Sequence, residues 1–210
     1  MGAEDRHGLL RRVGRVAAAL ALTLGALALL ALFVWPGRGQ LLCYVAGRGN
    51  VTATKLLLGI GANPNWQHPY LYGSSLHYAA RNGQTAVAQV LLDRGANPNA
   101  QDQHGETALH IAAMNGDIPL AKSLLGHGAD PNVVDKDWQS SPLVFAVARS
   151  KWEVAKLLLA RGADPNILGA GGSALDNAMD NPEMRRLLLA HGARHAPPDR
   201  PPPRPARMRR

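Results

Sequence analysis

The sequence predicts an all-α solenoid of about five repeats, each a helix-turn-helix followed by a β-hairpin loop, with one transmembrane helix before it. Three observations carry this prediction. A block of Gly, Ala, Asn or Asp, Pro and Asn recurs four times, at intervals of 34, 33 and 34 residues. A run of twenty uncharged residues precedes the first repeat. The net charge of +8 sits mainly at the two ends of the chain, which leaves the repeats close to neutral.

The uncharged run covers residues 16–35 and is long enough to span a bilayer. At about 1.5 Å per residue, a helix of this length matches the roughly 30 Å hydrocarbon core. A cleaved signal peptide is the alternative, but its apolar region is usually about 7 to 15 residues long and ends in a small-x-small site, which fits this run poorly. We therefore interpret residues 16–35 as an uncleaved signal anchor and residues 1–15 as its flank.

Basic residues flank this segment unequally. Four arginines precede it, whereas Arg38 and Arg48 are the two that lie within fifteen residues after it. This bias favours a cytoplasmic N-terminus, and four against two leaves the opposite orientation open. The excess of arginine over lysine indicates a bacterial source, so the sequence predicts a single-pass inner-membrane protein with its repeats in the periplasm. The run from Pro36 to Gly39 is expected to break the helix at the membrane exit.

Each recurrence of the five-residue block ends an apolar helical run. A leucine stands nineteen residues before each block and begins a short alanine-rich helix. Glycine adopts the left-handed conformation that ends a helix, and the proline three residues later prevents a restart. The glycines that the sequence assigns to this structural role are Gly61, Gly95, Gly128 and Gly162.

These elements resemble the ankyrin repeat. Residues 74–80 and 107–113 are similar to the T-P-L-H-x-A-A element of that family, and the recurring block is similar to its G-A-D-x-N element. The last repeat is two residues shorter between its leucine and its glycine and is interpreted as a terminal cap. The resemblance covers residues 40–195, with repeats at about 40–72, 73–105, 106–139, 140–171 and 172–195.

The resemblance also implies roles for individual side chains. In the family, the histidine of T-P-L-H bonds locally and ties neighbouring repeats, so His77 and His110 are expected to be structural. Cys43 and Val144 replace this histidine in the first and fourth repeats, where the junctions should depend more on apolar packing. Ankyrin-like proteins are non-enzymatic interaction modules that use their hairpin tips and the exposed side of the first helices.

Two groups of residues are therefore candidates for contacting a protein partner. Side chains on the first helices form one group. For the residue that follows the histidine, the alternative to partner contact is packing between repeats. Aromatic side chains of the hairpin tips form the other, and they either bind a partner, fold back on a neighbouring tip or, in the first hairpin, touch lipid headgroups. Arginine beside aromatic residues is typical of binding hot spots. The candidates are Trp66, Tyr70, Tyr78, Arg81, Asn82, Ile111, Met114, Asn115, Trp138, Phe145 and Arg149.

No pattern of residues predicts catalysis, a metal site or a cofactor site. The remaining histidines stand at hairpin tips, beside helix-ending glycines or outside the repeats, and neither a phosphate-binding loop nor a nucleophile motif is present. Cys43 is the only cysteine, which excludes an intramolecular disulfide and a cysteine-based zinc site. The sequence therefore predicts a non-enzymatic, membrane-anchored scaffold for another protein, with no small-molecule substrate.

The C-terminal residues 196–210 provide an alternative function. This tail contains six prolines and five arginines and is predicted to be disordered. Such a segment is attracted to phosphate groups without sequence specificity. The alternative is thus a basic-tail protein that binds anionic lipid or nucleic acid at the membrane surface, whereas the main prediction includes no specific nucleic-acid partner.

Overall fold

The computed structural model describes residues 37–68 and 73–195. The predicted transmembrane segment, the predicted disordered tail and Tyr70 lie outside the described residues. Within the two described ranges, no helix is both long enough and apolar enough to cross a membrane.

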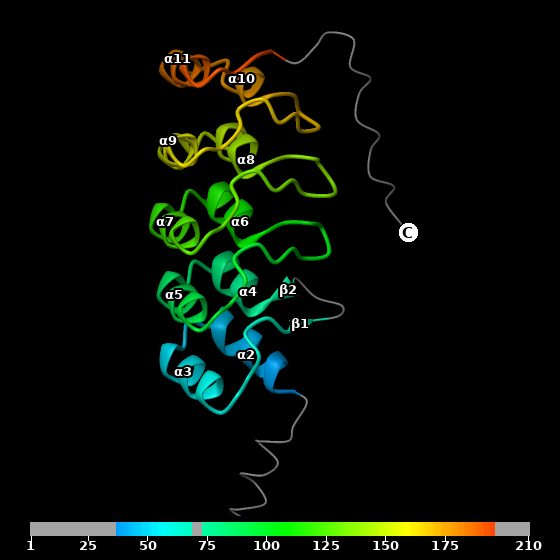
Figure 1. Cartoon of the computed structure of the whole chain (residues 1–210), viewed down its shortest axis with the longest axis vertical. Helices are drawn as coiled ribbons and strands as arrows, with labels where there is room; N and C mark the ends of the chain where they lie inside the picture. The colour runs from blue at the N-terminus through cyan, green and yellow to red at the C-terminus, as the bar shows by residue number, and fades with distance from the viewer. Residues whose placement is uncertain (1–36, 69–72, 196–210) are drawn as a thin grey trace, which may run out of the picture. The chain divides into compact units, whose positions relative to one another are not determined.

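The described chain is a stack of five helix pairs (Figure 1). The loops between pairs project from one side of the stack, next to the first helix of each pair, and the second helices line the opposite side. In the first loop, β1 (Gln67–His68) pairs antiparallel with β2 (Gly73–Ser74). The first helices are α2 (Arg38–Gly47), α4 (Ser75–Arg81), α6 (Ala108–Asn115), α8 (Pro142–Ala148) and α10 (Ala174–Asn177), and the second helices are α3 (Val51–Gly59), α5 (Thr85–Asp93), α7 (Ile118–Gly126), α9 (Trp152–Ala160) and α11 (Pro182–Ala190).

The helix boundaries follow local sequence signals. A serine or threonine in extended conformation precedes each of α4, α6, α8 and α10. Second helices α3, α5, α7 and α9 are each followed by one of the glycines predicted to end a helix, and these glycines have φ angles between +82° and +85°. L-residues rarely adopt this conformation, so the glycine is required at these positions.

Helix α2 begins earlier than the sequence predicts. The run from Pro36 to Gly39 is typical of a helix break, yet Arg38 and Gly39 form the first turn of α2. Ser74 is the N-cap of α4. Its counterpart in the first repeat is Gln40, and glutamine is not a favoured N-cap residue. Because no N-cap fixes the start at residue 41, the helix extends towards Gly37.

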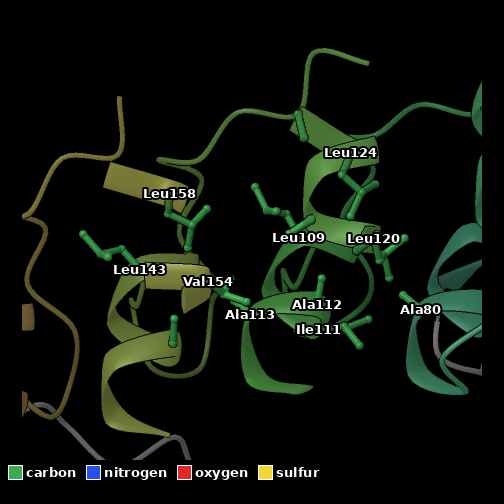
Figure 2. Close-up of a cluster of buried hydrophobic side chains, with 14 of the residues drawn as sticks. Ala80, Leu109, Ile111, Ala112, Ala113, Leu120, Leu124, Leu143, Val154 and Leu158 are labelled. Carbon is green, nitrogen blue, oxygen red and sulfur yellow. The ribbon is translucent and has the colours of Figure 1, made fainter. Parts of the chain in front are cut away.

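A continuous apolar core runs through the stack (Figure 2). In the third repeat, Leu109 of α6 lies beside Leu120 and Leu124 of α7, and Leu143 of α8 continues the core into the fourth repeat. All four leucines have 0% exposure. Burial of each such side chain contributes about 1.5–3 kcal/mol. Each helix pair is thus stabilised by its neighbours, as expected for a solenoid.

Asparagines of the recurring block connect successive repeats. The Nδ2 group of each one donates to the carbonyl of the helix-ending glycine one repeat later, at 3.0–3.2 Å. Its Oδ1 atom accepts from the amide two residues beyond that glycine, at 2.6–2.9 Å. These bonds satisfy backbone groups that the end of a helix leaves open. The asparagines are Asn65, Asn99, Asn132 and Asn166.

Candidate protein-interaction surface

Two buried histidines tie neighbouring repeats together. Nδ1 of His77 accepts from the backbone N–H of Ser74 at 3.2 Å, and its Nε2 lies 3.0 Å from the carbonyl of Glu106 in the next repeat. His110 makes the same pair of contacts with the N–H of Thr107, at 3.0 Å, and with the carbonyl of Ser140, at 3.1 Å. An Nδ1 that accepts and an Nε2 that donates define a neutral imidazole. Both histidines therefore have the geometry of structural ties.

Burial fixes the protonation state of three side chains in the stack. Desolvation lowers the pKa of His77 and lowers that of His110 to about 4, because a charged imidazole would lose its hydration there. Cys43 occupies the equivalent position in the first repeat, where burial raises the pKa of its thiol to about 12. Neutral imidazoles and a protonated thiol suit packing, so none of the three positions is prepared for proton transfer or nucleophilic attack.

Arg81 is a candidate partner contact that the structure places in an intramolecular ion pair. Its Nη2 lies 2.6 Å from Oδ2 of Asp102 and 2.9 Å from Oε2 of Glu106. Asp102 is buried and also accepts from the backbone amides of His104 and Glu106, at 2.9 and 3.0 Å. Burial raises the pKa of Glu106, and the Arg81 guanidinium opposes that shift. Arg81 thus holds the loop after α5 in place, and its side chain remains 30% exposed.

The position after the histidine differs from repeat to repeat. Ile111 is 2% exposed and belongs to the core, which favours the alternative of packing between repeats at this position. Phe145 is partly buried, with its ring edge-on to His110 at a centroid distance of 5.8 Å, and Tyr78 is also partly buried. The alternative of packing between repeats therefore describes Ile111 and much of Phe145.

A different position forms an exposed row along the stack. One residue at the C-terminal end of the first helix, at the same position in each of the first four repeats, is exposed. Met114 precedes one of them and is partly buried against the core. We name these residues the first-helix row: Arg48, Asn82, Asn115 and Arg149.

The aromatic residues of the loop tips behave differently from one another. Trp66 lies over α2 so closely that a Cβ on Gly39 would collide with its indole, so it folds back on its own repeat. The Trp138 backbone is fixed, because its N–H donates to Asp135 at 2.8 Å and its carbonyl accepts from Ala170 at 2.6 Å. The Trp138 ring is nevertheless 58% exposed. A fixed backbone with a free ring is suited to insertion into a partner's pocket.

Trp152, which is partly buried against the core, was not among the sequence candidates. Trp152, the first residue of α9, lines a shallow hollow together with Gly116, Ile118 and Lys151. The signal was present in the sequence, since a tryptophan at the start of a second helix has no counterpart in the other repeats. Within the part of the chain that the structure describes, no group of three His, Cys, Asp or Glu residues is placed to hold a metal ion.

Comparison with known proteins agrees with the geometry of the stack. A family model described as ankyrin repeats, in three copies, matches residues 42–135 and 109–199. The two matches together span most of the chain and all five helix pairs. Among curated proteins, no sequence matches this chain significantly.

Proposed function

Because this chain belongs to the ankyrin-repeat family, we propose that it is a non-enzymatic scaffold that binds another protein through the first-helix row and the Trp138 loop tip. Ankyrin repeats typically bind proteins and are typically non-catalytic. Two observations carry the proposal: an exposed row of polar and basic residues on the first helices, and an exposed aromatic side chain held on a fixed backbone at a loop tip. Tryptophan and arginine together are the residue types most enriched in binding hot spots.

The burial pattern supports this choice of surface. Arg81 and Ile111 are occupied within the stack, so Asn115, Trp138 and Arg149 are the better-exposed candidates of the central repeats. Asn115 and Trp138 belong to the third repeat and Arg149 to the fourth. Asn115 is the last residue of α6 and Arg149 follows the last residue of α8, and these two helices pack directly on each other. Asn115 and Arg149 are thus presented by neighbouring helices of the stack.

The test is photo-crosslinking in cells with the full-length chain. We expect replacement of Asn115, Trp138 and Arg149 by alanine to remove a specific crosslinked protein. The matched control replaces three exposed basic residues on the second-helix side, Lys122, Arg161 and Arg186, and should leave the crosslink intact. Circular dichroism should show equal helix content in both triple variants. An unchanged crosslink in the first variant would contradict the proposed surface.

We further propose that residues 16–35 anchor the scaffold in a membrane, with the repeats in the periplasm of a bacterial cell. The support is the uncharged sequence of that segment and the excess of arginine before it. Anchoring restricts the search for a partner to the membrane surface. A protease should digest residues 40–195 once the outer membrane is permeabilised and while the inner membrane is still intact. Digestion that begins only after the inner membrane is opened would contradict the proposed orientation.

A further inference from the structure

The outward side of the first repeat is apolar. Leu41 and Val45 share one face of α2, and Ala53 and Leu56 lie on α3. Leu56 is 65% exposed, and the other three are partly exposed, with Leu41 and Val45 also packed in part against the core. We name these four residues the first-repeat end face.

Equivalent positions in the later repeats show which way this face points. Ala174 and Ala178 of α10 stand where Leu41 and Val45 stand in α2, and both have 0% exposure. Since α10 packs on α8 of the preceding repeat, these positions point towards the preceding repeat. In the first repeat of the described chain, the same positions are not covered in this way.

The size of the side chains argues against another repeat as the cover. In the second to fifth repeats, the two positions on the first helix carry Ser, Ala or Pro, followed by Ala, and all are buried. These small residues allow the preceding helix to approach closely. Leu41 and Val45 are larger, so a repeat stacked at the usual spacing would collide with them.

The first repeat carries positive charge and no negative charge. Residues 6–92 contain no Asp or Glu, and the first repeat carries Arg38, Arg48 and Lys55. Described residues from Asp93 onward carry twelve acidic against ten basic residues. An apolar face on a repeat that carries basic residues and no acidic residue suits anionic lipid headgroups above acyl chains. The same excess of positive charge disfavours pairing of this face with the same face of a second copy.

From these observations we infer that the first-repeat end face rests on the surface of an anionic lipid bilayer. The inference builds on the proposed membrane anchor, which would bring this face close to the bilayer, because only Pro36 and Gly37 separate Trp35 from the start of α2. Contact with lipid would fix the direction of the stack relative to the membrane. The first-helix row would then be presented in one orientation.

The experiment uses the full-length chain, with Cys43 replaced by alanine, in vesicles of equal parts phosphatidylcholine and phosphatidylglycerol. An environment-sensitive fluorophore is attached through Leu56→Cys or, as the matched control at the other end, through Leu189→Cys, since Leu189 is 53% exposed. We expect nitroxide-labelled lipids to quench the label at 56 and aqueous iodide to quench the label at 189. Equal iodide quenching at both positions would overturn the inference. Shielding of position 56 only at high protein density would also overturn it, because contact between protein copies would then explain the shielding.

A charge variant tests the electrostatic part. Arg48→Glu with Lys55→Glu should reduce lipid contact at position 56, by about fivefold or more for each residue. The control pair Lys122→Glu and Arg161→Glu, both exposed in later repeats and outside the first-helix row, should leave that contact unchanged. Equal effects of the two pairs would contradict recognition by the first repeat.

Alkaline extraction separates this inference from the anchor. A chain that stays in the vesicles at high pH, with position 56 open to iodide, retains the anchor and overturns the end-face contact. A chain that alkali releases, with position 56 shielded by lipid before extraction, supports the end-face contact and overturns the anchor.

Discussion

The two ends of the stack differ at the positions that face outward. In the last repeat, Asp176 stands where the second repeat has His77, and Arg185 stands where it has Ala88. Asp176 closes a capping box with Ser173 and lies 2.8 Å from Nδ1 of His195. Met179 and Leu189 are apolar exceptions, 70% and 53% exposed. The last repeat thus places charged groups where an interior repeat places packing groups.

In the first repeat, the outward positions are apolar instead. Leu41 and Val45 are larger than their counterparts in the other repeats, and Leu56 is exposed. A terminal repeat surrounded by water needs a polar outer face. The charged groups of the last repeat suit contact with water, whereas the first repeat suits an apolar, anionic neighbour.

The largest expected effect is on stability, and it shows whether the two end repeats are packed equally well on their inner sides. Leu42 and Leu175 both have 0% exposure. Replacing either by alanine should cost about 2–5 kcal/mol of unfolding free energy, because each leaves a cavity. Leu56→Ala should change stability by less than about 0.5 kcal/mol, since this side chain is exposed. Urea denaturation of the full-length chain in bicelles, followed by circular dichroism, measures the three values; a small effect of Leu42→Ala would show that the first repeat is loosely packed.

The buried histidines that connect the interior repeats should make stability depend on pH. His110 has a pKa of about 4 in the fold against an ordinary value of 6.5, so the folded state favours the neutral imidazole. Its stabilising contribution is complete above pH 6.5 and is lost as the pH falls towards 4, by up to about 3 kcal/mol. The lowered pKa of His77 acts in the same direction.

Urea denaturation at pH 7 and at pH 5 should therefore show lower stability at pH 5. His110→Gln should reduce this difference, because glutamine does not titrate. His127→Gln is the matched control, as that histidine is exposed at the end of α7. An equal pH dependence in both variants would contradict the assignment.

Much of the fold could be predicted from the sequence because the repeat signals act locally. The helix-ending glycines depend only on backbone conformation, and their φ angles are those expected of a left-handed residue. The start of α2 at Arg38 was not predicted, because the lack of a favoured N-cap residue at Gln40 is a weak signal in the sequence.

The candidate site was less predictable, because exposure depends on neighbours in space. Arg81 looks like a surface arginine in the sequence, yet its partner Asp102 lies 21 positions away. Ile111 and Tyr78 occupy the same repeat position, and only packing decides that the isoleucine is buried. Trp66 folds onto Gly39, a contact that sequence spacing does not reveal.

A smaller effect tests the polar end of the stack. Asp176→Ala removes the capping box of α10 and should cost about 1 kcal/mol. Asp180→Ala is the control in the same repeat, because Asp180 is exposed and follows α10. Thermal unfolding of the full-length chain compares the two. Equal melting temperatures would show that the cap adds nothing, and the last repeat would then differ from the first only in its solvent-facing charge.

The smallest expected effect on stability comes from ending the chain after His195. This deletion removes five arginines and should change the unfolding free energy by less than about 0.5 kcal/mol, because the deleted residues are not predicted to build any core. It separates two sources of affinity for anionic lipid, since the tail and the first repeat are both basic. If the first repeat makes the contact, lipid quenching of a label at position 56 should be the same with and without the tail. If quenching and its salt dependence disappear with the tail, the basic tail carries the interaction with lipid, and the apolar end of the stack must be covered by something else.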